Sequence, residues 1–79
     1  MEQELRNETK KWLQRIEKER LTVGPQGKKG EEALRNIDAY VKDSMHFLEK
    51  GDLVRSFEAV IWAWSWIEIG LELEILKKV

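Results

Sequence analysis

The sequence offers few side chains that could take part in chemistry. It contains no cysteine and one histidine, His46, with neither a second histidine nor an H-E-x-x-H pattern near it. Zinc sites need several cysteine, histidine or carboxylate ligands at defined spacings. We therefore expect no metal site and no cofactor. His46 falls on the polar side of its predicted helix and is expected to lie in solvent.

Two carboxylates remain as candidates for a polar site. Asp43 and Glu68 each fall at the margin of an apolar helical face, on two different predicted helices. Brought together, such a pair could share a proton or hold a hard cation. The commoner outcome is that each carboxylate is exposed or bonded to a neighbouring cation or tryptophan N–H. Asp43 and Glu68 are kept as a candidate site, and no catalytic residue is predicted.

A glycine-rich segment raises the question of phosphate binding. The segment Thr22–Gly30 reads TVGPQGKKG and contains a Gly-Lys pair. A Walker A loop needs four residues between its first glycine and the Gly-Lys pair, a preceding strand, and a serine or threonine after the lysine. Because none of these conditions is met, the segment is predicted to be a plain linker between two helices.

These candidates must be positioned by helices, because only the helical period is found in the chain. Apolar residues recur at i, i+3 and i+4 over residues 2–21, 31–50 and 53–77, with no period-two alternation and no hairpin signal. Gly51 suits the left-handed position that ends a helix, and Asp52 suits the N-cap of the next one. The sequence therefore predicts an all-α fold, an up-and-down three-helix bundle in a single domain over residues 1–79.

The helix predicted over residues 53–77 is apolar on two sides. One stripe has the pattern of a core-facing surface and is flanked by small residues. A second stripe lies nearly opposite and consists of Trp62, Trp66, Ile69, Leu73 and Leu76. Because a helix with two apolar sides is usually buried on both, we expect this stripe to form the interface of a homodimer. The open alternative is that the first helix covers the stripe within one copy.

Composition and charge restrict the function further. A 79-residue chain with a net charge of -1 is not expected to be a general nucleic-acid binder, because such proteins carry a basic surface. The N-terminus has no apolar signal-peptide region. The longest uncharged run, residues 59–67, is far shorter than the roughly 20 residues of a membrane span. We therefore expect a cytoplasmic protein that makes no membrane contact.

Three groups of helix-packing residues have a recognisable order and spacing. They are Tyr40, Asp43, Ser44, Phe47, Leu48, Gly51 and Asp52, then Phe57-Glu58-Ala59, then Trp66-Ile67-Glu68-Ile69-Gly70. In this order they resemble a small archaeal family catalogued as domain of unknown function three-fifty-seven. The chain departs from the family pattern at Ser65, where glycine is usual, and at Glu68, where aspartate is usual. The resemblance implies a closed three-helix bundle with a left-handed twist in an archaeal cytoplasm, and no established activity.

The leading interpretation is a non-enzymatic helical interaction module that self-associates through its long C-terminal helix. This interpretation also allows an unidentified protein partner. Two alternatives stay open: a helical domain that binds a small ligand or nucleic acid, and, least favoured, an enzyme that uses Asp43 and Glu68. A basic patch would support the first alternative, and a deep pocket joining the two carboxylates would support the second.

Overall fold

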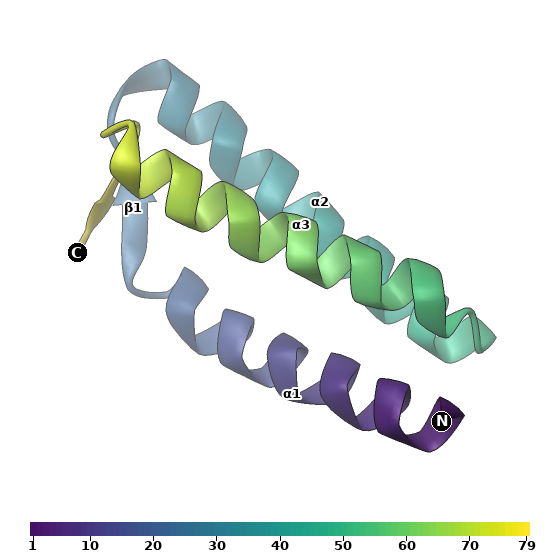
Figure 1. Cartoon of the computed structure of the whole chain (residues 1–79). Coiled ribbons are helices and arrows are strands. Elements are labelled where there is room, and N and C mark those ends of the chain that lie inside the picture. Colours follow the sequence, from purple (N-terminus) through teal and green to yellow (C-terminus); the bar gives the residue numbers. More distant parts are fainter.

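Three helices alternate in direction along a rod-shaped molecule in the computed structural model, which describes all 79 residues (Figure 1). The helices are α1 (Glu2–Arg20), α2 (Gly27–Lys50) and α3 (Leu53–Glu72). They account for 80% of the chain, and the molecule measures 40 × 16 × 16 Å. The prediction of an all-α three-helix bundle is confirmed. None of the helices is long and apolar enough to cross a membrane.

A two-stranded sheet, called the clasp below, closes one end of the bundle. β1 (Val23–Pro25) pairs antiparallel with β2 (Leu76–Lys78). Four expectations are wrong: that the chain has no strand, that residues 22–30 are a plain linker, that the second helix begins at residue 31, and that the last helix reaches residue 77. Strands of this length leave no period-two pattern, because alternation is recognisable only over about four residues or more.

α3 ends at Glu72 because a left-handed residue closes its last turn. Glu74 has a φ of 61°. The backbone N–H groups of Glu74 and Ile75 donate to the carbonyls of Leu71 and Gly70 at 3.2 and 3.0 Å. This is the Schellman arrangement, which usually has glycine at the left-handed position. Because a glutamate stands there, the sequence carries no signal for the end of the helix.

The clasp packs against α2 and α3 through two glycines. A Cβ added to Gly30 would lie 2.0 Å from the Ile75 carbonyl oxygen, and one added to Gly70 would lie 2.5 Å from Cδ1 of Leu76. The backbone N–H of Gln26, the residue before α2, donates to the same Ile75 carbonyl at 2.8 Å. The glycine-rich segment therefore allows the start of α2 to pack closely against the backbone of Ile75.

The turn between α2 and α3 follows the prediction. Gly51 is left-handed, with a φ of 79°, and the N–H of Asp52 donates to the Phe47 carbonyl at 2.9 Å. The Asp52 side chain caps α3 by accepting a hydrogen bond from the N–H of Arg55 at 3.2 Å. These contacts fix α2 and α3 as an antiparallel pair with a short connection.

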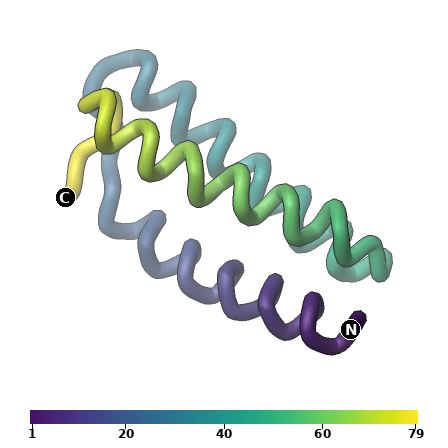
Figure 2. Tube along the Cα trace, in the orientation of Figure 1, coloured from purple at the N-terminus to yellow at the C-terminus, as the bar shows by residue number.

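α1 contacts the other two helices unequally. It packs mainly against α3 and only sparsely against α2, as the trace in Figure 2 illustrates. The rings of Trp12 on α1 and Trp64 on α3 meet edge to face at 5.7 Å, and the Trp64 indole N–H donates to the Trp12 carbonyl at 3.2 Å. One core cluster with residues from all three helices fills the space between them.

Candidate interaction surface

The largest exposed apolar feature of α3 is a row of side chains that face away from the core. Trp62, Ile69 and Leu73 are 55%, 38% and 64% exposed, and Trp66 between them is half-buried. Their spacings of four, three and four residues place all four on one line along a helix. We call these four residues the α3 stripe.

The two tryptophans of the stripe are attached to the rest of the molecule in different ways. Trp62 stacks on Tyr40 of α2, with ring centroids 6.5 Å apart and an interplanar angle of 23°. Trp66 packs against the hydrophobic core. Both rings are therefore held in place before any partner binds, which lowers the entropy lost on association.

Leu76, which was predicted to extend the stripe, does not belong to it. The residue lies in β2, is only 2% exposed and packs against Gly70. The prediction is wrong because it continued the helical projection past the true end of α3. Leu76 is instead part of the core beneath the clasp.

α1 does not cover the stripe. Trp64, which packs on Trp12 of α1, lies on the other side of α3 from the stripe. At about 100° per residue it is roughly 160° around the helix from Trp62 and 180° from Leu73. The small residues next to the stripe, Ala59 and Ala63, are buried. The alternative in which the first helix buries the stripe within one copy is therefore excluded.

Asp43 and Glu68 are both exposed, and the structure does not bring them together. The hydrogen bonds between Ser44 and Ser56 set the register of α2 against α3. With that register, Asp43 and Glu68 lie about 16 Å apart along the helix axes at 1.5 Å per residue. An acid pair or a shared cation between these two carboxylates is therefore not possible in this fold.

His46 lies where it was expected, exposed on the polar side of α2. Its ring is 5.8 Å from that of Phe47. No group of three or more histidine, aspartate or glutamate side chains comes together. The expectation of no metal and no cofactor stays a prediction.

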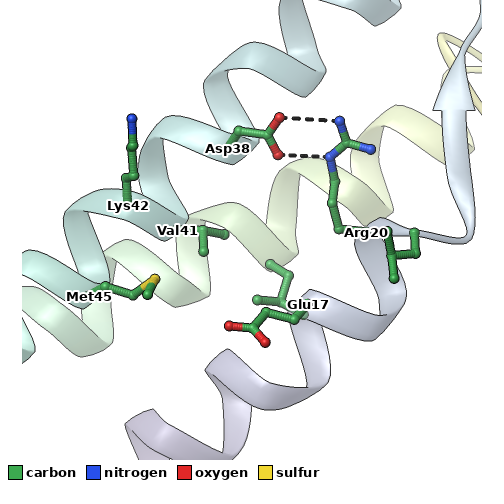
Figure 3. Close-up of a pocket in the computed structure, with 8 residues that line it drawn as sticks. Glu17, Arg20, Asp38, Val41, Lys42 and Met45 are labelled. Atoms are coloured by element: carbon green, nitrogen blue, oxygen red, sulfur yellow. Dashed lines mark hydrogen bonds and ion pairs between the residues drawn. The ribbon is translucent and has the colours of Figure 1, made fainter.

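One pocket was not foreseen: a groove between α1 and α2, with a volume of about 260 Å³. Ile16 and Val41 contribute to its apolar lining, and Arg20 of α1 reaches across one end to Asp38 of α2 (Figure 3). Two hydrogen bonds join that pair, at 2.8 and 3.2 Å. Arg20 and Asp38 are 18 positions apart in the chain, and no local sequence pattern links residues at that separation. The groove could therefore be found only from the way α1 packs on α2 and α3.

An ion pair on the exposed surface of α1 shifts the pKa of one carboxyl group. A hydrogen bond from Lys11, together with its charge, lowers the pKa of the Glu8 carboxyl. The two groups are 2.9 Å apart, one helical turn from each other. This is an ordinary ion pair between exposed side chains of one helix.

Comparison with known proteins agrees with the fold and the sequence pattern. The model of a family described as "Protein of unknown function (DUF357)" matches residues 7–76. The crystal structure of protein AF1782 from Archaeoglobus fulgidus, of the same family, is similar to this chain with a TM-score of 0.91 and 54% sequence identity. The match covers 99% of this chain and 97% of that one. The chain matches no curated protein.

Proposed function

We propose, for a chain that belongs to the DUF357 family, a non-enzymatic role as a helical interaction module that self-associates through α3. The observation that supports this role is the α3 stripe, in which Trp62 and Leu73 are more than half exposed. Tryptophan is enriched in protein interfaces and at their energetic centres. A second copy presents the same stripe, so one surface serves both partners.

The size of the stripe favours burial by a partner. Its four side chains present an apolar patch on the order of several hundred Å², which is at the upper end for a soluble monomer. Removing such a patch from water contributes several kcal/mol at about 25 cal/mol per Å², before the costs of association are subtracted. The patch is smaller than a standard interface, so a moderate affinity is expected.

The flanks of the stripe argue against nucleic acid as the partner. The exposed charged residues on the open flank of the stripe are Glu58 and Glu72, and one cation, Arg55, lies beyond its N-terminal end. Base stacking on tryptophan works together with a basic groove along the phosphate backbone. A like-charged helix would repel that backbone, whereas an apolar surface of a second copy meets no such barrier.

The groove between α1 and α2 gives weaker support to the small-ligand alternative. Its volume of about 260 Å³ is below the roughly 300–1,000 Å³ of common ligand sites. The charged residues at its end, Arg20 and Asp38, already form two hydrogen bonds with each other. The groove therefore offers little free polar chemistry to orient a ligand.

The test is a pair of leucine-to-glutamate variants on opposite surfaces. Leu73→Glu places a charge in the stripe, at a side chain 64% exposed, and should halve the mass measured by light scattering without loss of helix content. Leu21→Glu makes the same change at a leucine 81% exposed in the groove, and should leave the mass unchanged. Equal masses for both variants and the wild type would rule out the stripe as the interface.

A further inference from the structure

We infer that two copies meet antiparallel, with their α3 helices crossing about a two-fold axis that passes between Trp66 and Ile69. This inference rests on the proposed self-association and adds its direction. In the resulting pair, Trp62 of one copy lies against Leu73 of the second copy, and Trp66 lies against Ile69.

The spacing of the stripe identifies a helix as the occupant. Intervals of four, three and four residues form the seam along which two helices pack at a small crossing angle. The other large exposed apolar side chains of the folded region, such as Leu21, Met45 and Val54, lie on different elements or faces and form no second row. α3 of a second copy is therefore the one matching surface that this chain offers. A self-complementary contact closes into a dimer, not an open fibre.

The distribution of bulk along the stripe favours the antiparallel direction. Its N-terminal end is wide, because Trp62 is backed by the stacked ring of Tyr40. Its C-terminal end is narrow, with Ile69 and Leu73 alone. A parallel pair would set the two wide ends against each other and leave a gap at the narrow ends. An antiparallel pair sets wide against narrow and keeps the helices at one separation, as close packing requires.

The flanks of the stripe favour the same direction. One flank is a row at seven-residue spacing, Glu58, Ser65 and Glu72, and it is open to solvent apart from the half-buried Ser65. The other flank, Ser56, Ala63 and Gly70, is buried within the monomer. Antiparallel helices bring like flanks together, so the two acidic rows meet at a water-filled edge, where solvent and salt screen the repulsion between them. Parallel helices would press each acidic row against the partner's covered flank, where burying a carboxylate is costly.

The same open row provides the test, because it can be labelled without changing the stripe. The chain has no cysteine, so Glu58→Cys, Ser65→Cys and Glu72→Cys each carry one nitroxide label. In the antiparallel dimer, the axial separations between identical labels are about 28, 8 and 14 Å at 1.5 Å per residue. Pulsed and continuous-wave electron paramagnetic resonance should therefore rank the distances Ser65, Glu72, Glu58, from shortest to longest.

The outcomes separate this inference from the proposed function. Three equal distances in a protein of dimer mass would overturn the antiparallel direction and leave the α3 interface standing. The control is Met45→Cys, whose label lies in the groove between α1 and α2 and not on the α3 stripe. Its label-to-label distance should be longer than that of Ser65→Cys. If Met45→Cys gives the shortest distance, the dimer forms through the groove and both proposals fail. A labelled protein with the mass of a monomer would likewise contradict both.

Discussion

Ser44 and Ser56 exchange hydrogen bonds between α2 and α3. The Ser44 hydroxyl donates to the Ser56 carbonyl at 2.8 Å, and the Ser56 hydroxyl donates to the Ser44 carbonyl at 2.6 Å. Both residues are fully buried. The exchange fixes the register of the two helices at the end of the molecule away from the clasp, and it satisfies both hydroxyls without water.

Replacing either serine with alanine should destabilise the protein. We expect Ser44→Ala and Ser56→Ala each to lower the free energy of unfolding by about 1–2 kcal/mol, because each removes a buried hydrogen bond between helices. The double variant should cost less than the sum of the two, since the residues are in contact. Urea denaturation followed by circular dichroism provides all three values. Single variants as stable as the wild type would show that the exchange contributes nothing.

Gly30→Ala should disrupt the clasp. The added methyl group would lie 2.0 Å from the Ile75 carbonyl oxygen, and neither backbone can yield without separating β2 from α2. We expect a loss of at least about 1–3 kcal/mol, the range for overpacking. Lys28→Ala, at an exposed position in the same first turn of α2, is the control and should change stability by less than about 0.5 kcal/mol. Thermal unfolding of the two variants makes the comparison, and equal midpoints would count against the clasp.

The two left-handed helix ends should respond in opposite ways to substitution. Gly51, with a φ of 79°, and Glu74, with a φ of 61°, occupy the same position of the motif after α2 and α3. Gly51→Ala should therefore cost about 1 kcal/mol, and Glu74→Gly should be neutral or stabilise by up to about 1 kcal/mol. Denaturant midpoints measure both effects. A clear destabilisation by Glu74→Gly would mean that the glutamate side chain has a role beyond the turn.

The helices could be predicted because each one produces a pattern among residues that are close together in the sequence. The i, i+3, i+4 recurrence of apolar residues located all three helices, and the Gly51-Asp52 pair located the turn between the last two. The small residues of α3, Ser56, Ala59 and Ala63, are buried as close helix packing requires. Each of these signals lies within a few residues of the structure that it predicts.

The clasp could not be predicted in this way, because its determinants are far apart in the sequence. β1 pairs with β2 near the other end of the chain, and Gly30 matters through its contact with Ile75. Nothing near Glu74 signals the end of α3. The misplacement of Leu76 in the stripe follows directly from that missed end. Trp62 and Ile69 were identified because they lie in α3, and Leu73 because this C-cap residue still has helical backbone angles.

The candidate polar site failed for a related reason. Helical projection places Asp43 and Glu68 at the margins of their own faces, but it carries no information on the register between α2 and α3. That register comes from a contact between Ser44 and Ser56, whose partnership no local pattern reveals. The same limitation concealed the Arg20–Asp38 pair and the groove beside it.

The most direct test of the account is the mass of the wild-type chain in solution. Sedimentation equilibrium should be run from low micromolar to tens of micromolar, at moderate salt. We predict a concentration-dependent shift from the monomer mass of 9.4 kDa toward twice that value, because the α3 stripe is buried between two copies. A mass of 9.4 kDa throughout that range would contradict self-association through α3.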